Sequence, residues 1–441
     1  MPQLDLTVGA TASILEEKIR TRRARVGIVG LGYVGLPLAV EFAKAGFTVT
    51  GIDISPEKTA LVNAGESYIG DIPTSTLRPL VESGKLRATT DFSAVLELDT
   101  INICVPTPLR KTKDPDMSYI VSSCQEIAKH FHAGMLVILE STTYPGTTDE
   151  VVLPLLAKSG LEVGTDFFVC FSPERVDPGN PKYQTSNIPK VVGGCTPVCT
   201  EMGRQFYSQA LQHVVPVSST QVAEMVKLLE NTFRMINIGL VNEIAMMCDR
   251  ISINVWEVID AAATKPFGFM PFYPGPGLGG HCIPIDPFYL SWKTKQAGIE
   301  ARFIELAGYI NGQMPHFVVD KIQNALNDAG KPVKGSKIHI MGVAYKRDID
   351  DMRESPALDV MLLLSRRGGI ISYSDPHVPV LKVEGLDLTA APESAAADAD
   401  CVVIVTDHSS FDYKSLVDNA SLIVDSRNAL KAFHSPKIVR L

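Results

Sequence analysis

The feature that most constrains the fold of this chain is a glycine motif between two short β-branched segments. Residues 25–29 read RVGIV, and the next six read GLGYVG, with Gly30, Gly32 and Gly35 in the register G-x-G-x-x-G. The amphipathic segment LPLAVEFAKAG comes next and leads into the apolar segment FTVTGID. A strand, a tight turn, a helix and a second strand within about 30 residues predict the first βαβ unit of a doubly wound α/β domain.

Each glycine of the motif has its own expected role. Gly30 permits the turn, Gly32 lets the backbone approach a pyrophosphate, and Gly35 lets the helix pack on the strand, while the helix N-terminus supplies N–H donors. Asp53 ends the second strand and would accept a hydrogen bond from a ribose 2′-hydroxyl but repel a 2′-phosphate. The motif therefore predicts NAD rather than NADP. The alternative is a glycine turn of another α/β protein with nothing bound.

The same alternation continues through the first half of the chain. TINICVP (100–106) and MLVILEST (135–142) are predicted to be buried strands, and FFVCFSPERVDPG (167–179) begins as a strand and ends in a loop that carries Glu174. Thr107 and Thr142 lie at the carboxyl ends of strands, where open α/β sheets bind ligands. Taken singly, such threonines are more often turn or cap residues.

The middle of the chain is predicted to be helical. Residues 219–250 form one long helical pattern, and further helical patterns cover 252–263 and 287–325. On the long helix, Lys227, Asn231 and Arg234 share a face, which is either solvated or lines a cleft. We therefore interpret this region as a helical connector and a dimer surface.

After the linker GKPVKGS (330–336) the α/β alternation starts again. KIHIMGVAYK (337–346) is a predicted strand and turn, ESPALDVMLLLSRRGG a helix, and IISYSDP, DCVVIVTDH and ASLIVDSR are strands. The pattern predicts a second doubly wound domain. Because it lacks G-x-G-x-x-G, this domain is expected to bind a nucleotide differently or to serve as a lid.

Composition argues against several classes of protein. Lys and Arg number 41 and Asp and Glu 49, and the resulting charge of −8 argues against a nucleic-acid partner. The sequence contains no uninterrupted run of about 18 apolar residues, so no membrane span is predicted. The N-terminus lacks the pattern of a secretory signal. Eight scattered cysteines suit a reducing cytoplasm. Cys195 and Cys199 lack a second ligand pair, so no metal site is predicted.

The loop that is richest in glycine and proline carries a cysteine. Residues 271–287 read PFYPGPGLGGHCIPIDP, a composition that fixes a loop and lets a ligand approach the backbone. Asp286 and Pro287 are expected to be the N-cap and first residue of the next helix. A cysteine near a helix N-terminus can be a nucleophile, so Cys282 is either that or a small buried apolar residue. The neighbouring His281 is not evidence for a Cys–His dyad.

Together these motifs resemble the UDP-glucose/GDP-mannose dehydrogenase family, whose members oxidise nucleotide sugars to uronic acids. The resemblance covers nearly the whole chain and is very specific, because six motifs occur in order. They are GLGYVGLP at 30–37, STTYPGTT at 141–148, FSPERVDPG at 171–179, KLLENTFR at 227–234, GPGLGGHCIPIDP at 275–287 and YKRDIDDMRESPA at 345–357.

The resemblance implies two Rossmann-like doubly wound domains joined by a long central helix and a helical dimerisation region. The implied parts are an N-terminal extension (1–22), an NAD-binding domain (23–209), a helical domain with the cysteine loop (210–325) and a UDP-sugar-binding domain (326–441). A homodimer or higher homo-oligomer is implied as well. Residues 266–293 look most like bacterial UDP-N-acetylglucosamine 6-dehydrogenases, and the segment 264–274 is where sugar specificity is expected.

The family's functional residues transfer to matching positions. Cys282 matches the thiol nucleophile, Lys227 and Asn231 flank the reacting oxygen, Asp286 is the carboxylate of C-x-x-x-D, and Glu174 assists thioester hydrolysis. Cofactor contacts are expected from Gly30, Gly32, Tyr33, Val34, Gly35, Asp53, Lys58, Thr107, Thr142 and Arg353. UDP-sugar contacts are expected from Arg175, Val176, Arg234, Tyr273, Gly277, Gly279, Tyr345, Lys346 and Arg427.

The implied chemistry explains why these residue types are needed. Oxidation of a C6 alcohol to an acid removes four electrons, and NAD accepts two at a time. A thiolate adds to the intermediate aldehyde, the adduct is oxidised to a thioester, and water cleaves the thioester. One cysteine, one cation beside the oxyanion and one carboxylate for the water form a minimal set, which Cys282, Lys227 and Glu174 fill.

Other functions remain as alternatives. The nearest are the same oxidation of UDP-glucose, of UDP-N-acetylgalactosamine or of UDP-N-acetylmannosamine. A two-electron hydroxyacid dehydrogenase needs neither Cys282 nor residues 337–441. A non-catalytic sensor of NAD and nucleotide sugars would not need Cys282, Lys227 and Glu174.

Overall fold

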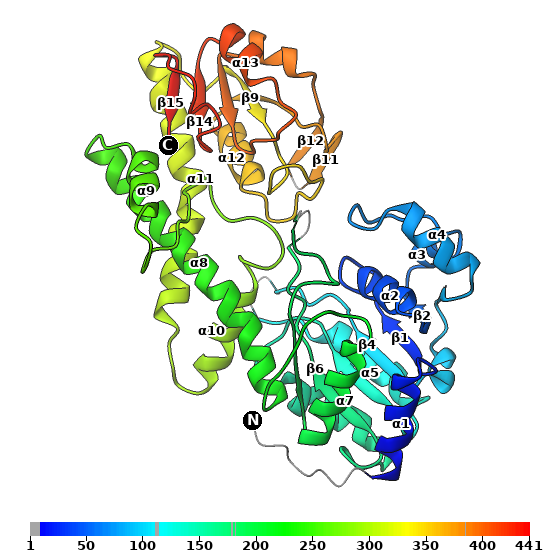
Figure 1. The fold of residues 1–441 in the computed structure, drawn as a ribbon. Coiled ribbons are helices and arrows are strands. Elements are labelled where there is room, and N and C mark those ends of the chain that lie inside the picture. Colours follow the sequence, from blue (N-terminus) through cyan, green and yellow to red (C-terminus); the bar gives the residue numbers. More distant parts are fainter. Residues whose placement is uncertain (1–8, 111–113, 178–179, 181, 384) are drawn as a thin grey trace. The chain divides into compact units, whose positions relative to one another are not determined.

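A computed structural model describes residues 9–110, 114–177, 180, 182–383 and 385–441. The chain divides into two compact units, Met1–Glu230 and Asn231–Leu441 (Figure 1). Each unit has a parallel β-sheet and its own apolar core. The long helix α8 (Thr220–Arg250) begins in the first unit and ends in the second, which agrees with the helix predicted over 219–250.

The first unit is built on an eight-stranded sheet of order β3-β2-β1-β4-β5-β6-β7-β8. Neighbouring strands run parallel, except for β6 and β7. The order reverses between β1 and β4, so the turn after β1 lies at the switch point where open sheets bind ligands. The strands are β1 (Arg25–Val29), β2 (Thr48–Ile52), β3 (Leu86–Thr89), β4 (Thr100–Ile103), β5 (Leu136–Leu139), β6 (Phe168–Phe171), β7 (Lys190–Gly194) and β8 (Val214–Pro216).

Helices cover both faces of this sheet. They have to, because the side chains of the central strands are apolar on both faces. In β5, Leu136 and Ile138 belong to one core, while Val137 and Leu139 belong to the other. A strand that is buried on both sides reads as an unbroken apolar run, which is why the sequence identifies it. The helices are α1 (Ala10–Arg20), α2 (Gly35–Lys44), α3 (Pro56–Asn63), α4 (Thr74–Glu82), α5 (Ser118–Ala128), α6 (Leu153–Leu156) and α7 (Pro197–Ser208), with short turns η1 (Phe92–Glu97), η2 (Thr148–Val152) and η3 (Ala157–Ser159).

The described part of the N-terminal extension is the helix α1, to which the sequence analysis assigned nothing. It buries Ala12, Leu15 and Ile19 and packs against α7. Lys18 Nζ lies 2.7 Å from a carboxylate oxygen of Asp99, on the loop before β4. Helix α1 is therefore an integral part of the first unit.

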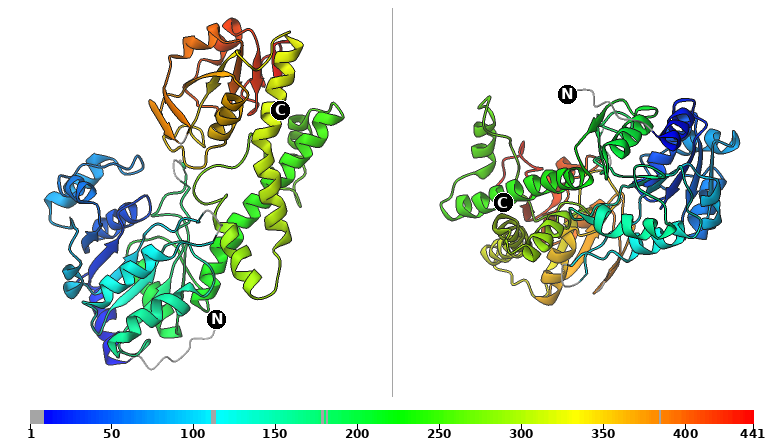
Figure 2. Two further views of the ribbon diagram at one scale, coloured as in Figure 1. Left: turned by 180° about the vertical axis from the view of Figure 1, so that it is seen from behind. Right: turned by 90° about the horizontal axis from the view of Figure 1, so that it is seen from below.

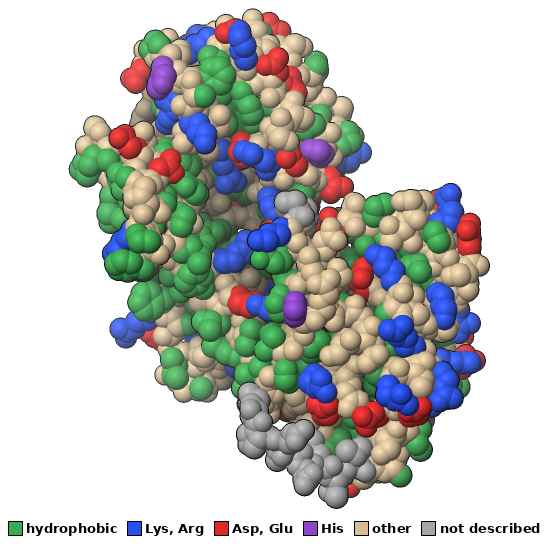
Figure 3. Space-filling model, in the orientation of Figure 1, with side chains coloured by type: hydrophobic (Ala, Val, Ile, Leu, Met, Phe, Trp, Pro, Cys, Tyr) green, Lys and Arg blue, Asp and Glu red, His purple; other side chains and the backbone are tan. Residues whose placement is uncertain are grey.

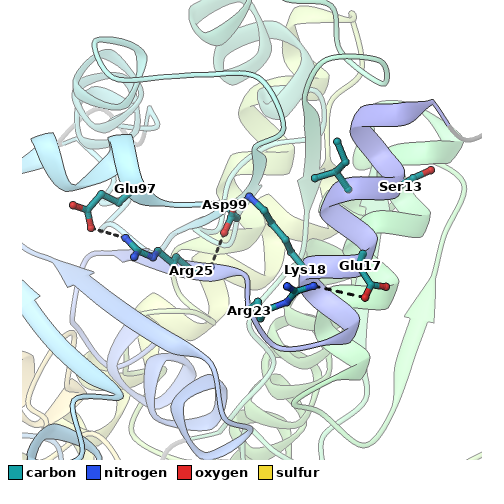
Figure 4. A pocket seen from close by; sticks show the side chains of 8 residues that line it. Ser13, Glu17, Lys18, Arg23, Arg25, Glu97 and Asp99 are labelled. Atoms are coloured by element: carbon teal, nitrogen blue, oxygen red, sulfur yellow. Dashed lines mark hydrogen bonds and ion pairs between the residues drawn. The ribbon is translucent and has the colours of Figure 1, made fainter.

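A pocket of about 560 Å³ lies beside α1 (Figure 4). Its lining carries charges of both signs, including the ion pair between Arg25 and Glu97, whose atoms are 2.8 Å apart. Because Arg25 begins β1, the pocket lies at the amino end of the strands. Open α/β sheets bind ligands at the carboxyl ends, so this pocket is not the expected cofactor site.

The second unit contains a five-stranded parallel sheet of order β10-β9-β13-β14-β15 and a two-stranded hairpin. Both large sheets thus have the predicted doubly wound α/β architecture, which is confirmed. The strands are β9 (Lys337–Met341), β10 (Ile370–Ser374), β11 (Val380–Val383), β12 (Leu386–Thr389), β13 (Cys401–Ile404), β14 (Ile423–Asp425) and β15 (Ile438–Arg440). The helices are α9 (Val255–Ala263), α10 (Asp286–Gln296), α11 (Arg302–Asp328), α12 (Pro356–Arg366), α13 (Tyr413–Asn419) and the short η4 (Glu393–Asp398).

The helical part of this unit differs from expectation at one place. The predicted helical stretch 287–325 is two helices, α10 and α11, because Gly298 adopts a left-handed φ of +77° that ends the first. Helix α11 runs beside the C-terminal half of α8 (Figure 2), and a Cβ on Gly239 would lie 3.2 Å from Ala307. Gly239 therefore permits the close approach of the two helices. Within the described part of the chain, no helix is both long and apolar enough to cross a membrane.

Candidate active site

The glycine motif occupies the turn between β1 and α2, and each glycine meets a different surrounding. Gly30 has a φ of +90°, and a Cβ there would lie 2.7 Å from the Cys104 carbonyl oxygen. A Cβ on Gly35 would lie 1.8 Å from the Gly30 carbonyl oxygen, whereas nothing lies within 4 Å of a Cβ on Gly32. The first and third glycines are thus required by packing, and Gly32 leaves the backbone open to a ligand.

Asp53 follows β2 and holds the turn in place. One carboxylate oxygen accepts from the Leu31 N–H at 2.8 Å and the other from the Ser55 N–H at 2.9 Å. Lys58 Nζ lies 3.8 Å from Asp53. Asp53 is thus fixed beside the glycine motif at the carboxyl edge of the sheet, where a ribose could reach it. These residues fit an NAD molecule, whose pyrophosphate the open backbone at Gly32 would accept.

Glu224, at the start of the second turn of α8, fixes the loop after β5. Its carboxylate accepts hydrogen bonds from the N–H groups of Gly146 and Thr148 at 2.5 and 2.9 Å, and from the Thr148 hydroxyl at 2.7 Å. The loop carries Thr142, a predicted cofactor contact. Burial raises the pKa of Glu224 to about 7, although these hydrogen bonds oppose the shift.

Glu174 and Lys227 lie together in the first unit. Lys227 Nζ donates to the Glu174 carbonyl oxygen at 2.7 Å, and the N–H groups of Arg175 and Val176 donate to Glu174 Oε1 at 2.7 and 2.8 Å. Burial alone would raise the pKa of Glu174. The charge of Lys190, the two N–H donors and the charge of Lys227 outweigh burial and place that pKa below its usual value. Glu174 is therefore held as a carboxylate, which is the state that a general base must start from.

Arg175, a predicted substrate contact, is engaged with α8. Its guanidinium forms two contacts with the Glu230 carboxylate, at 2.5 and 3.2 Å, and donates to the Pro189 carbonyl oxygen at 2.7 Å. The residues Pro178 and Gly179, which end the motif FSPERVDPG, lie outside the described residues.

In the second unit, Cys282 lies one turn before α10. Its carbonyl oxygen accepts from the Asp286 N–H at 2.8 Å, and the residue is partly exposed. The expectation that Asp286 is the N-cap is wrong, because Ile285 is the cap and Asp286 is the first residue of α10. Asp286 is buried, and its carboxylate accepts from the Asn231 side-chain amide at 2.6 Å. Cys282 thus lies just before the N-terminus of an 11-residue helix.

The glycines before Cys282 are packed against the second sheet's loops. A Cβ on Gly275 would lie 2.8 Å from the Arg427 guanidinium, and one on Gly279 would lie 2.6 Å from Tyr345 Cβ. Gly277, at a φ of +142°, would place its Cβ 3.1 Å from Pro356. The loop thus brings its backbone against Tyr345 and Arg427. Burial lowers the pKa of Arg427, whose Nε donates to the Val405 carbonyl oxygen.

Two residues that were predicted to contact a ligand instead contact neighbouring residues of their own unit. The Tyr273 hydroxyl donates to Asp260 at 2.8 Å, and its ring stacks on Trp256. Arg353 pairs with Asp351, at 2.7 Å. The remaining predicted residues are buried (Thr107), half-buried (Val34, Lys58, Thr142, Val176, Lys346) or exposed (Tyr33, Arg234).

The sequence analysis missed a group of buried polar side chains that support these loops. Lys190 and Glu140 form an ion pair at 2.5 Å inside the first unit. Asn242 accepts from the Gly275 N–H at 3.0 Å inside the second. A charge at the edge of an apolar run, as in VILE and KVVGG, is the signal that could have identified the ion pair.

One cluster with histidines and one pair of cysteines contain residue types that can bind a metal. Among the described residues, Asp348, His377 and His408 form the group with metal-ligand spacing. His408 Nδ1 already accepts from the Asp348 N–H at 2.9 Å, and Nε2 lies 3.0 Å from Asp375. Both ring nitrogens are thus used within the fold. Burial raises the pKa of the Cys195 and Cys199 thiols, which disfavours the thiolates that a metal needs.

The first unit defines the class of protein, because a glycine turn and an acidic residue at the switch point of a parallel sheet form a dinucleotide-binding domain. Comparison with known families gives the family. Residues 24–211 match the NAD binding domain of the UDP-glucose/GDP-mannose dehydrogenase family, 221–313 its central domain and 339–432 its UDP binding domain. The chain belongs to this family and is an NAD-dependent oxidoreductase of nucleotide sugars.

Individual proteins agree with this assignment. UDP-N-acetyl-D-mannosamine dehydrogenase of Salmonella typhimurium is 36% identical over 403 residues, covering 88% of this chain and 94% of that protein. UDP-N-acetyl-D-glucosamine 6-dehydrogenase of Pseudomonas aeruginosa is 35% identical over 392 residues, covering 88% and 91%. The UDP-D-ManNAc dehydrogenase structure from Pyrococcus horikoshii has a TM-score of 0.86 and 33% identity, covering 94% and 98%.

Glu224 generates a prediction about stability and pH. Its folded-state pKa of about 7 exceeds its ordinary value of 4.5, so its stabilising contribution is present below about pH 4.5 and is lost as the pH rises to about 7. Relative to Glu224→Gln, the wild type should lose about 3 kcal/mol of unfolding free energy between pH 4.5 and pH 8. Urea unfolding of both proteins across this range measures the difference, and a constant difference would contradict the assignment.

Proposed function

We propose that this protein oxidises the C6 alcohol of a UDP-N-acetylhexosamine to the uronic acid, in two steps with two NAD per sugar. The observation that supports this best is the cysteine loop. Cys282 lies one turn before α10, and the glycines before it pack against Tyr345 and Arg427. A partly exposed thiol at the end of a loop that packs against a half-buried arginine provides a nucleophile and an anion site within one unit.

The residues of each unit supply distinct parts of this chemistry. Cys282 adds to the aldehyde, and hydride loss from the adduct leaves a thioester. Lys227 and Asn231, one turn apart on α8, are the proposed donors to the reacting oxygen, and Asp286 holds the Asn231 amide. Glu174 takes the proton of the water that cleaves the thioester. NAD, when bound, supplies the hydride acceptor for both oxidations.

The cofactor is proposed to lie on the first sheet. Gly30, Gly32 and Gly35 form its turn, with Tyr33 and Val34 beside them, and Asp53 would accept from the adenosine ribose. Lys58, Thr107, Thr142 and Arg353 are the other proposed contacts of the cofactor.

The UDP-sugar is proposed to contact Arg175, Val176, Arg234, Tyr273, Gly277, Gly279, Tyr345, Lys346 and Arg427. We also propose the domain boundaries predicted from the sequence and a cytoplasmic location, which its eight free cysteines suit.

Replacement of the proposed nucleophile gives a direct test. Cys282→Ser should leave NAD and UDP-sugar binding largely unchanged but stop acid formation, because a serine hydroxyl has a far higher pKa than a thiol. The wild type should make two NADH per sugar and the variant at most one. Counting NADH against sugar consumed measures this, and two NADH per sugar from the variant at a near wild-type rate would refute the mechanism.

The sugar is a separate question. Residues 266–293 favour UDP-N-acetylglucosamine, whereas relatives named for UDP-N-acetylmannosamine favour its 2-epimer. We predict that UDP-N-acetylglucosamine has the highest kcat/KM and that UDP-glucose is used about 10–200-fold less well, since one small apolar group discriminates by no more than that. The measurement is kcat/KM for UDP-N-acetylglucosamine, UDP-N-acetylmannosamine, UDP-N-acetylgalactosamine and UDP-glucose. A clear preference for UDP-glucose would contradict any N-acetyl assignment.

We also propose a homodimer built on the helices of the second unit. Large apolar side chains lie exposed from the middle of α8 to the residue after its end, and along the first half of α11, and Figure 3 shows apolar side chains gathered over α8. They are Phe233, Leu240, Met247, Ile251, Phe303, Leu306 and Tyr309. An apolar surface this continuous is typical of a face covered by another subunit.

The dimer has its own test. The wild type should have twice the mass of one chain by light scattering, and Leu240→Asp with Leu306→Asp should yield monomers, because a twofold interface would bury four new charges, two from each subunit. Ile54→Asp is the matched control, since Ile54 is 80% exposed in the first unit and should leave the dimer intact. A stable, active wild-type monomer would contradict the proposal.

A further inference from the structure

Lys190, the first residue of β7, is a buried ammonium between two carboxylates. Its side chain is 3% exposed. Nζ lies 2.5 Å from Glu140 Oε2 and 3.5 Å from Glu174 Oε2. A buried ammonium is costly unless paired, so this arrangement is tightly specified. The sequence separates these residues by 50 and 16 positions, and the sheet brings them together.

The Glu140 side of the cluster is closed. Glu140 Oε1 accepts from the Asn102 amide at 2.9 Å and from the Tyr207 hydroxyl. The Tyr207 ring centre lies 5.4 Å from Lys190 Nζ. The Glu140 side chain is 0% exposed, so Glu140 has no direct route to solvent and fixes the ammonium in position.

The Glu174 side is open. Its Oε1 is occupied by the N–H groups of Arg175 and Val176, which leaves Oε2 facing Lys190. The Glu174 side chain is 13% exposed. Among the acidic groups of this cluster, Glu174 is thus the one that can exchange a proton with water.

We propose that Lys190 is a positioning residue for the hydrolytic step: anchored by the Glu140 carboxylate and packed against the Tyr207 ring, it holds Glu174 Oε2 in place as a carboxylate that accepts a proton from the attacking water. This rests on the proposed function. The water oxygen forms a bond to the thioester carbon, its proton passes to Glu174, and the C–S bond breaks to release the thiolate of Cys282 and the free acid. Glu174 then returns the proton to solvent, and nothing is oxidised or reduced.

The cluster also explains why an ionised Glu174 is tolerated inside the protein before the step. Lys190 and Glu140 form a neutral pair whether or not Glu174 carries a proton. Lys227, which donates to the Glu174 carbonyl oxygen at 2.7 Å, offsets the charge of the ionised state. The buried pair therefore needs no rearrangement during the step.

The test separates hydrolysis from oxidation by using three variants. Lys190→Met with Glu140→Gln removes both charges together, so that no unpaired buried charge compromises folding. Lys190→Arg keeps the cation. Tyr207→Phe removes a hydroxyl that contacts Glu140 but not Glu174, and is the matched structural control. Each is mixed with NAD and the preferred UDP-sugar while NADH release and intact mass are followed.

The double variant should release two NADH per active site in a burst and then turn over roughly 100-fold more slowly than wild type, since loss of a general base has about this effect. Its intact mass should show the acyl-enzyme. The Lys190→Arg variant should turn over faster than the double variant, because it keeps the cation. The Tyr207→Phe variant should turn over the substrate without accumulating the acyl-enzyme. Rapid adduct hydrolysis by the double variant, or equal adduct in Tyr207→Phe, would overturn the proposal. Absence of NADH from the wild type with every UDP-sugar would instead refute the proposed function.

Discussion

Both sheets of this protein depend on one kind of turn, in which a glycine follows the first strand and a carboxylate from the neighbouring strand holds it. In the first unit Gly30 has a φ of +90° and Asp53 accepts from the Leu31 N–H. In the second, Gly342 has a φ of +79° and Asp375 accepts from the Val343 N–H. A Cβ at either glycine would lie within 2.7 Å of a carbonyl oxygen on the adjacent crossover, so no other residue fits.

The two turns differ in what they leave open. Asp53 accepts from two backbone N–H groups, and the backbone beyond it is open at Gly32. Asp375 accepts from four backbone N–H groups and also pairs with His408, so its oxygens are committed to the fold. The same scaffold thus suits a dinucleotide in one unit and serves as internal support in the other. In the second unit the turn itself thus takes up the carboxylate, which agrees with the absence of a G-x-G-x-x-G motif there.

The sequence predicts the features that depend on neighbours along the chain. The βαβ unit around Gly30–Gly35, the helix over 219–250 and the restart of strands at 337 follow from local periodicity, and the structure confirms them. Features set by distant neighbours were not predictable in this way. Helix α1 packs on α7, and the Lys190–Glu140 pair joins residues 50 positions apart. The carboxylate of Asp286 is likewise engaged by Asn231, 55 positions away, so the local cap pattern gave the wrong role.

Helix α8 shows how such distant contacts support function. Within the first unit, Glu224 holds the loop at Gly146 and Thr148, and three residues later Lys227 holds the Glu174 carbonyl oxygen. Within the second unit, Asn231 holds Asp286 and Asn242 holds the Gly275 N–H. These positions recur at intervals close to whole helical turns, so they share one face of α8. Each polar side chain is buried, and each is satisfied by a loop that the proposed chemistry uses. From Glu224 to Asn242 these positions extend over about five helical turns, so a helix of the usual three turns could not carry all four, whereas α8 does.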